Sequence, residues 1–354
     1  MIEIVKAAVQ RGASDIHLKA GDVVRARVNG VLQPLTKQRL SPDQTRQIAS
    51  QLIADPEARE TLDQIKDYDC SWAAPGVGRF RVNVLRQRGT FMVVMRVIPV
   101  EVPTLDDLGL PAVLRTIAEA ERGLVLVTGI TGSGKSTSLA AMIDHINATS
   151  HRHVITLEDP IEFLHRDRKA SITQREVGGD TASFAVGLRA ALREDPDVIL
   201  VGEMRDTETI DTALKAAETG HLVLSTLHTQ NAVRTVSRIV AVFPPEEQEM
   251  VRVRFAETIV AVISQRLLPR KESGGRTAAV EVMLGTGTVK DVLLEAERVD
   301  EIFDLMADGR EQYGSQTFDQ HLMDLVREET VSYEVAKAAA SNPGDFELKM
   351  RMFA

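Results

Sequence analysis

The 354-residue chain is poor in the residues that cross-link small secreted domains, because it contains only one cysteine, Cys70. A lone cysteine excludes an internal disulfide and a cysteine-based zinc site, so apolar packing must hold the fold together. Aromatic residues make up only 4% of the sequence while hydrophobic residues make up 44%, so the cores are mostly aliphatic. We expect Cys70 to be a half-buried strand residue.

Long hydrophobic runs are also absent. No stretch approaches the roughly 18 apolar residues of a membrane-spanning helix, and the N-terminus lacks the pattern of a signal peptide. We therefore expect a cytoplasmic protein with no direct membrane insertion. The net charge of −9 argues against a surface that binds nucleic acid throughout, although it leaves a local basic groove open.

The chain length predicts two or three domains, and the composition changes near residue 99. Residues 1–98 alternate apolar and polar positions around an Asn29-Gly30 turn, which is typical of half-buried antiparallel strands. Prolines cluster over 99–111 and predict an interdomain linker. Residues 112–354 alternate continuous apolar strands with helices, which predicts a mostly parallel sheet and a helical C-terminal region. The expected fold class is α/β.

The expected elements follow from these patterns. In the first domain they are a helix over 2–11, a helix that begins at Ser41-Pro42, and strands over Arg79–Leu85 and Phe91–Ile98. In the second domain the expected strands are Leu124–Thr128, Val154–Leu157, Val198–Val201 and Leu222–Ser225. The expected helices are 135–147, 182–194, 207–219 and 245–267, before a helical region from about 285.

A phosphate-binding motif follows the first of these strands. Residues Gly129 to Ser136 have the form G-x-x-x-x-G-K-S, and the strand before and helix after are those that a P-loop requires. Backbone N–H groups of such a loop surround the phosphates of ATP, Lys135 reaches the β- and γ-phosphates, and the Ser136 hydroxyl ligates Mg²⁺. The residues expected to bind the nucleotide are Gly129, Thr131, Gly132, Ser133, Gly134, Lys135, Ser136 and Thr137.

Acidic residues end two further strands of the same sheet. The strand Val198–Val201 leads to Glu203, a Walker B pattern in which Glu replaces the usual Asp. We therefore favour Glu203 as the base that activates water over a direct metal ligand. The strand Val154–Leu157 leads to Glu158, Asp159 and Glu162, which are candidates for binding Mg²⁺ or positioning water. Solvation in a loop remains the alternative for Glu158 and Glu162.

Two histidines flank the strand Leu222–Ser225. His228 follows it at the edge where the acidic residues are expected, and a neutral imidazole there can donate a hydrogen bond to the γ-phosphate. His221 precedes the strand. For both residues, a role as a capping or core histidine remains the alternative.

These segments resemble the four motifs of the secretion-superfamily ATPases. The matching segments are 129–137, the acidic box 157–162, the run 192–206 and the histidine box 219–229. Over essentially its whole length the chain resembles the type IV pilus retraction ATPases of the PilT/PilU family, and 12–18, 174–178 and 316–320 add to the likeness. One segment departs from it: Thr288–Leu293 stands where retraction ATPases usually carry Ala-Ile-Arg-Asn-Leu. The sequence does not distinguish the PilT type from the PilU type.

The resemblance implies a PAS-like N-terminal domain, a RecA-like ATPase domain with ATP bound between them, and a homohexameric ring. The ring would lie beneath an inner-membrane platform protein, with a PilT/PilU paralogue as a further candidate partner, and would drive pilus retraction and twitching motility. Glu203 would be the catalytic glutamate, Glu162 a metal- or water-positioning acid and His228 the γ-phosphate sensor. Arg81 and Arg96 would face the nucleotide. From the sequence alone these arginines could equally be exposed strand residues.

Four other functions agree less well with the sequence. A pilus assembly or secretion ATPase of the same superfamily usually carries a tetracysteine zinc module, which one cysteine cannot form. A nucleic-acid translocase needs a basic, aromatic groove, and this acidic chain has three tyrosines and one tryptophan. A small-molecule kinase needs an acceptor site and a lid that excludes water, and the chain length and the hydrolysis-type Glu203 argue against it. A scaffold that binds ATP but hardly hydrolyses it is disfavoured by the intact set of Lys135, Ser136 and Glu203.

Overall fold

The computed structural model describes residues 1–99, 101–272 and 274–352. Position 100 of the expected linker, and positions 273, 353 and 354 of the expected second domain, lie outside the described residues. The chain forms two compact units, Met1–Glu101 with Glu162–Leu164, and Val102–Ile161 with His165–Ala354. The sequence did not indicate that Glu162–Leu164 belongs with the first unit. The domain boundaries 1–98, 99–111 and 112–354 stay a prediction.

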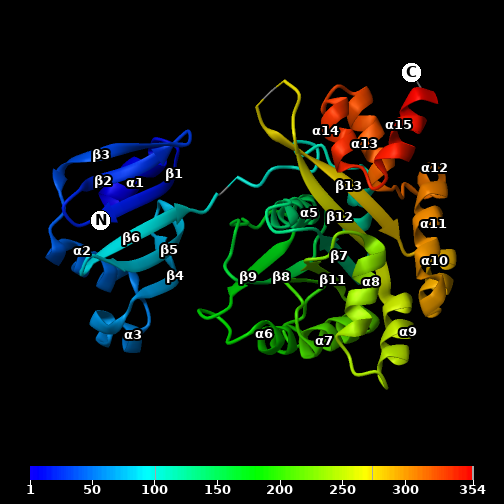
Figure 1. Cartoon of the computed structure of the whole chain (residues 1–354). Helices are drawn as coiled ribbons and strands as arrows, with labels where there is room; N and C mark the ends of the chain where they lie inside the picture. Colours follow the sequence, from blue (N-terminus) through cyan, green and yellow to red (C-terminus); the bar gives the residue numbers. More distant parts are fainter. Residues whose placement is uncertain (100, 273, 353–354) are drawn as a thin grey trace. The chain divides into compact units, whose positions relative to one another are not determined.

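The first unit is built on a six-stranded antiparallel sheet of order β3-β2-β1-β6-β5-β4 (Figure 1). Its strands are β1 (Ala13–Lys19), β2 (Val23–Val28), β3 (Val31–Arg39), β4 (Asp67–Ala74), β5 (Gly78–Gln87) and β6 (Thr90–Val97). Its helices are α1 (Ile2–Gln10), α2 (Pro42–Leu52) and α3 (Pro56–Glu60). Alternate strand residues such as Ile16, Leu18 and Val82 form its core, which confirms the expected half-buried antiparallel strands.

Local sequence explains two of the turns in this unit. Asn29 and Gly30 both have positive φ, 49° and 79°, as a tight hairpin turn between β2 and β3 requires. Ser41 caps α2 by accepting a hydrogen bond from the N–H of Gln44, whose own side chain bonds back to the Ser41 N–H. The expected turn and helix start are confirmed.

The second unit contains a seven-stranded sheet of order β13-β12-β7-β11-β10-β8-β9. Its strands are β7 (Gly123–Thr128), β8 (His153–Glu158), β9 (Ser171–Glu176), β10 (Val198–Val201), β11 (Leu222–Leu227), β12 (Ile259–Pro269) and β13 (Arg276–Leu284). Every neighbouring pair is parallel except β12 and β13, which are antiparallel. The predicted mostly parallel sheet is confirmed.

Helices cover both faces of this sheet (Figure 1). They are α4 (Val113–Ala118), α5 (Lys135–Thr149), α6 (Phe184–Ala191), α7 (Thr207–Glu218), α8 (Ala232–Ala241), α9 (Gln248–Thr258), α10 (Gly287–Leu294), α11 (Ile302–Asp308), α12 (Arg310–Tyr313), α13 (Phe318–Arg327), α14 (Tyr333–Ala339) and α15 (Pro343–Met352). Leu124 and Leu126 of β7 pack in the core with α6–α9, whereas Val125 and Val127 pack in the core with α4 and α5. Burial on both faces explains why β7 is apolar from Leu124 to Val127.

The helix expected over 245–267 is wrong in its second half. The chain is helical only as α9, and Ile259–Pro269 is β12, which pairs with β7. The segment begins Ile-Val-Ala-Val-Ile, a β-branched run buried on both faces, and periodicity alone cannot distinguish such a strand from a buried helix. The strands β9 and β13 and the helix α8 were not predicted.

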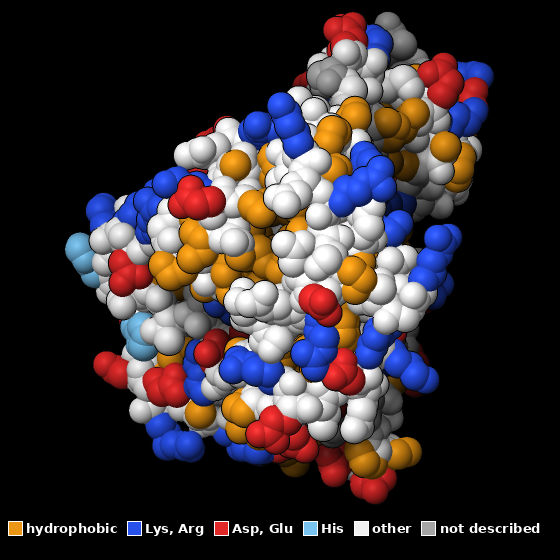
Figure 2. Space-filling model, turned by 90° about the vertical axis from the view of Figure 1, so that its left-hand side faces the viewer, with side chains coloured by type: hydrophobic (Ala, Val, Ile, Leu, Met, Phe, Trp, Pro, Cys, Tyr) orange, Lys and Arg blue, Asp and Glu red, His pale blue; other side chains and the backbone are white. Residues whose placement is uncertain are grey.

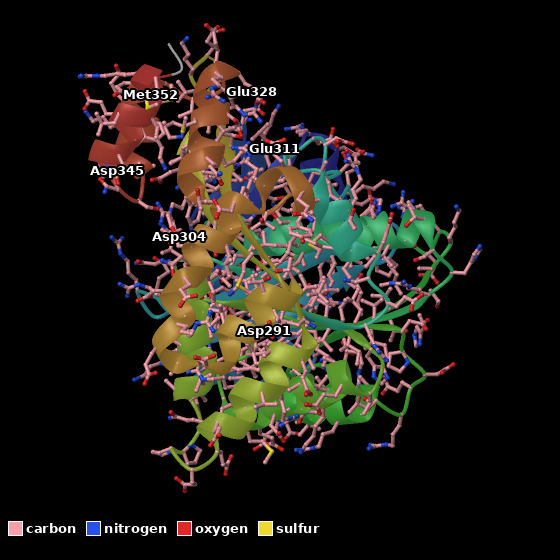
Figure 3. The ribbon with its side chains drawn as sticks, turned by 90° about the vertical axis from the view of Figure 1, so that its right-hand side faces the viewer. Asp291, Asp304, Glu311, Glu328, Asp345 and Met352 are labelled. Atoms are coloured by element: carbon pink, nitrogen blue, oxygen red, sulfur yellow. The ribbon has the colours of Figure 1, made fainter. Side chains whose placement is uncertain are left out.

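Helices α13–α15 form a separate layer against β12 and β13, with Phe318 and Phe346 in its core, whereas α10 and α11 pack in the core shared with α6–α9. Acidic side chains are exposed along the C-terminal region from α10 to α15: Asp291, Asp304, Glu311, Glu328 and Asp345 (Figure 3). On the face drawn in Figure 2, lysine and arginine side chains lie interspersed with aspartate and glutamate. Within the described parts of the chain, every helix falls short of the length and hydropathy that a membrane span requires.

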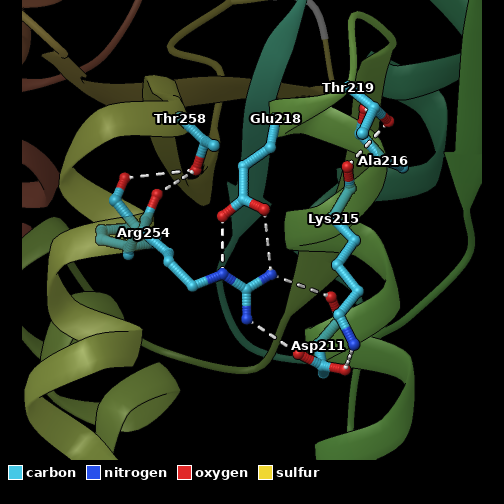
Figure 4. A network of polar contacts seen from close by, with 8 residues as sticks. Asp211, Lys215, Ala216, Glu218, Thr219, Arg254 and Thr258 are labelled. Carbon is cyan, nitrogen blue, oxygen red and sulfur yellow. Dashed lines mark hydrogen bonds and ion pairs between the residues drawn. The ribbon is translucent and has the colours of Figure 1, made fainter.

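A polar network fixes α9 against α7 (Figure 4). The guanidinium of Arg254 donates to Glu218 Oε1 over 2.6 Å and to Asp211 Oδ1 over 2.8 Å. Asp211 also pairs with Lys215, at 2.6 Å. Because one arginine binds two carboxylates on the neighbouring helix, the network orients α9 just before β12 begins.

Candidate functional site

The P-loop connects the end of β7 to the start of α5. Gly129 has φ 142°, Gly132 has φ 80° and Gly134, the N-cap of α5, has φ 92°. A Cβ on Gly129 would lie only 2.5 Å from the carbonyl oxygen of Gln265 and from Ser133 Oγ. The loop therefore needs glycine for both conformation and space.

Two side chains of the loop, those of Lys135 and Ser133, can bind a polar ligand. The Lys135 ammonium donates to the carbonyl oxygens of Gly129 and Ile130, at 2.9 and 3.1 Å. Burial lowers the pKa of Lys135, and the charge of Glu203 opposes that shift. Ser133 Oγ is buried without a hydrogen-bond partner among the described residues. An orphaned hydroxyl and a buried cation at a helix N-terminus fit a phosphate group.

Glu203 lies two residues beyond β10, on the same edge of the sheet. Its carboxylate is 2.7 Å from the guanidinium of Arg205 and 3.6 Å from Nε2 of His228. Gly202 precedes it where a Cβ would approach the carbonyl oxygen of Leu157 to 3.1 Å. The structure thus brings Glu203, His228 and the P-loop lysine together, as expected. Arg205 was missed, although it lies inside the 192–206 motif.

The two histidines differ in their surroundings. The side chain of His228 is 43% exposed and faces Glu203, so it is free to meet a ligand. His221 donates from Nδ1 to the carbonyl oxygen of Ala216 over 2.9 Å at the opposite end of β11. His221 is therefore a capping residue of α7, and His228 is the one at the site.

The acidic box is divided between different environments. Glu158 accepts hydrogen bonds from Thr156 Oγ1 at 2.7 Å and from Gln174 Nε2 at 3.1 Å. Asp159 is exposed, and Glu162 belongs to the first unit. Glu176, which was not predicted, accepts from the N–H of Ile161 over 3.1 Å. These contacts hold the box in place.

The candidate metal ligands Ser136, Glu158 and Asp159 offer only oxygen atoms, as Mg²⁺ prefers. Ser136 is exposed at the start of α5. In residues 1–99, 101–272 and 274–352, no group of three or more His, Cys, Asp or Glu side chains is arranged to hold a metal ion. Such a set fits a cation that keeps waters and binds substrate phosphates rather than a protein cage.

The two candidate arginines lie opposite each other on β5 and β6 of the first unit. Arg96 Nε donates to Asp15 Oδ1 over 3.0 Å, and Arg81 is exposed. Burial raises the pKa of Asp15, but hydrogen bonds from Ser14 and Arg96 outweigh it and hold the pKa below its usual value. Asp15, in the 12–18 motif, was not recognised as the partner of Arg96. A nucleotide contact of either arginine stays a prediction.

The chain was compared with known proteins. Residues 1–343 match the family described as Type II/IV secretion system protein. The chain is 44% identical over 344 residues to the "Type IV pilus retractation ATPase PilT" of Pseudomonas aeruginosa, covering 97% of this chain and 99% of the relative. It is 41% identical to the "Type IV pilus ATPase PilU" of the same organism, covering 99% of this chain and 91% of the relative.

The chain is also similar to a solved structure. The chain superimposes on the structure described as the pilus retraction motor PilT with bound ADP with a TM-score of 0.88 and 44% identity. The match covers 98% of this chain and 99% of that chain. The likeness therefore extends over both units.

Proposed function

This chain belongs to the Type II/IV secretion system protein family, and on that basis we propose that it is an ATP-hydrolysing motor that retracts type IV pili. The ATPase activity is inferred from one observation: Lys135, Glu203 and His228 lie close together at one edge of the sheet. The relatives named for pilus retraction match it over nearly their whole length, which supports the motor function.

Each of the chain's own groups has a chemical role in this proposal. The P-loop amides and Lys135 bind the phosphates, and the Ser136 hydroxyl, with Glu158 and Asp159 from the end of β8, holds Mg²⁺. When bound, the cation neutralises charge on the phosphates. Glu203 takes a proton from the attacking water. His228 donates to the γ-phosphate and senses its loss. Arg81 and Arg96 stabilise charge on the nucleotide, and Glu162 positions water or the metal ion.

The family relationship also suggests the assembly. We expect a cytoplasmic homohexamer that docks through an inner-membrane platform protein, with a PilU- or PilT-like paralogue as a further partner. ATPase activity should then rise cooperatively as subunits assemble, and a fully active monomer would contradict the ring.

The second candidate function is a pilus assembly or secretion ATPase of the same superfamily. It is disfavoured by the single cysteine, because the tetracysteine module usual in those proteins cannot form. The divergent segment Thr288–Leu293 lies entirely within α10, so its coupling role needs a direct test.

Pilus number on cells distinguishes these functions. Cells that lack the gene, and cells complemented with Lys135→Ala, should both carry excess pili and be immobile if the protein retracts pili. Bald cells would instead identify an assembly motor. Unchanged piliation would identify an accessory or redundant paralogue. Phosphate release by the purified Glu203→Gln variant checks the base, and undiminished release would refute that role.

A further inference from the structure

Three polar side chains form a row across β7, β12 and β13, the three strands at one side of the second sheet. Ser264 of β12 pairs with Thr128 of β7 on one side and with Glu281 of β13 on the other. Thr128 Oγ1 donates to Ser264 Oγ over 3.0 Å, and Ser264, the cross-strand neighbour of Glu281, acts to lower the pKa of that carboxyl group. All three residues are buried, with Glu281 only 2% exposed. The row begins one residue before the P-loop.

The far end of the row reaches the segment that follows His228. Glu281 Oε1 accepts a hydrogen bond of 2.8 Å from the N–H of Ala232, the first residue of α8. Only Thr229, Gln230 and Asn231 separate Ala232 from His228. A second contact, between the hydroxyls of Thr229 and Thr235 at 2.7 Å, closes this loop onto the same helix. Asn231 also caps α8 by accepting a hydrogen bond from the N–H of Arg234 over 2.9 Å, so Glu281 is the one contact among these that reaches the loop end from another strand.

Burying the Glu281 carboxyl group costs free energy. Burial raises the pKa of Glu281 to about 7, although the Ala232 amide, the charge of Arg266 and Ser264 all oppose the shift, and Asp319 adds to it. An apolar residue would avoid that desolvation. A carboxylate at this position accepts a hydrogen bond from the first N–H of α8, which an apolar residue cannot do, and it lies beside Ser264 in the row that leads to the P-loop.

We propose that Glu281 is a positioning residue for ATP hydrolysis, which joins the P-loop strand to the first turn of α8 and so sets the place of His228 relative to the P-loop. The inference rests on the proposed function, because it assigns His228 to the reaction. Glu281 contacts no reacting atom itself. It acts through the loop 228–231, so its loss should weaken the chemical step more than the binding of ATP.

The test compares the steady-state ATPase kinetics of the full-length protein with those of Glu281→Ala and Glu281→Gln. The alanine variant should lose about 10- to 100-fold in kcat, the size expected when a reacting group is displaced by about 1 Å, with KM within about twofold of the parent. The glutamine variant should largely retain kcat because its amide oxygen can still accept from the Ala232 N–H. A rise in KM with kcat unchanged would overturn the proposal.

A double variant shows whether Glu281 acts through His228. Because the two residues would work as one unit, His228→Ala with Glu281→Ala should be no slower than His228→Ala alone. If the two losses multiply instead, Glu281 acts elsewhere and the proposal is wrong.

Amide hydrogen exchange provides a readout that does not depend on ATPase activity. Glu281→Ala should speed exchange in peptides over 226–236, whereas Glu281→Gln should not. Asp319→Asn is the matched control, because this buried carboxylate accepts from the N–H of Ser341 at 2.7 Å and has no bond to the loop. It should leave both kcat and loop exchange unchanged. If the parent protein hydrolyses no ATP, the proposed function fails, while unaltered exchange in Glu281→Ala would sink the positioning role alone.

Discussion

Nδ1 of His321 accepts a hydrogen bond of 2.8 Å from the backbone N–H of Val280. The bond attaches α13 to β13, next to the bridge between Val282 and Gln316 that holds the same helix layer to the same strand. The imidazole is only 8% exposed, and burial lowers its pKa to about 4. Since Nδ1 accepts, the ring must be neutral with its proton on Nε2.

This pair predicts an acid-sensitive attachment of the C-terminal helices. The folded protein keeps His321 neutral down to about pH 4, whereas the unfolded chain protonates it near pH 6.5. Stability from this group is therefore full above pH 6.5 and is lost as the pH falls towards 4, by up to about 3 kcal/mol. The His321→Gln side chain can still accept a hydrogen bond from the Val280 N–H, but it cannot titrate. Between pH 7 and pH 4, the Tm of this variant, measured by calorimetry, should therefore fall less than the Tm of the parent protein. Identical acid dependence in both proteins would contradict the neutral ring.

Glu281 should give the opposite pH dependence. Its pKa rises from 4.5 to about 7 on folding, so the folded protein retains a proton that the unfolded chain loses. Stability then falls as the pH rises from about 4.5 to 7 and stays lower above it, by at most about 3 kcal/mol. Glu281→Gln removes this titration, so its Tm relative to the parent should increase from pH 5 to pH 8. A constant difference in Tm across that range would show that Glu281 is ionised in the folded protein.

The Arg254 network predicts a stability cost that depends on burial. The Arg254 side chain is 17% exposed and joins Asp211 to Glu218, whereas Lys215 is 62% exposed. Arg254→Ala leaves the part-buried Glu218 without its cation and Asp211 with Lys215 alone, and it should destabilise the protein by about 2–3 kcal/mol. Lys215→Ala should cost less than about 1 kcal/mol. Urea unfolding followed by circular dichroism compares the two variants, and equal losses would refute the ranking.

The sequence predicted those parts of the site that are local in the chain. The P-loop, the acid after β10 and the histidine after β11 each follow a buried strand, so parallel pairing alone brings them to one edge. Partners from distant segments could not be found in this way. Asp15 meets Arg96 from 81 residues away and Glu281 meets Ala232 from 49 residues away. The helix expected over 245–267 failed because β12 begins with five apolar residues, Ile259–Ile263, and this run shows no alternation that would mark the period of a strand.

Two glycines of the P-loop separate the effect of space from the effect of backbone conformation. At Gly129 an added methyl group would clash with the Gln265 carbonyl oxygen at 2.5 Å, and φ is 142°; at Gly132 φ is 80° and nothing lies within 4 Å. Gly132→Ala therefore meets only the strain of positive φ, about 1–2 kcal/mol. Gly129→Ala must also displace β12 or the loop, so it should cost more than about 3 kcal/mol and abolish nucleotide binding.

Thermal unfolding and titration with a fluorescent ADP analogue measure both effects on the same samples. Gly132→Ala should stay folded and bind nucleotide with an affinity weakened by no more than about tenfold, which is the 1.4 kcal/mol scale of the strain. If Gly129→Ala binds as well as Gly132→Ala, the close approach between the P-loop and the Gln265 carbonyl is not needed for the site. If Gly132→Ala loses nucleotide binding as completely as Gly129→Ala, the positive φ at Gly132 is essential for binding. Backbone conformation, rather than space for a side chain, would then limit which residues this loop accepts.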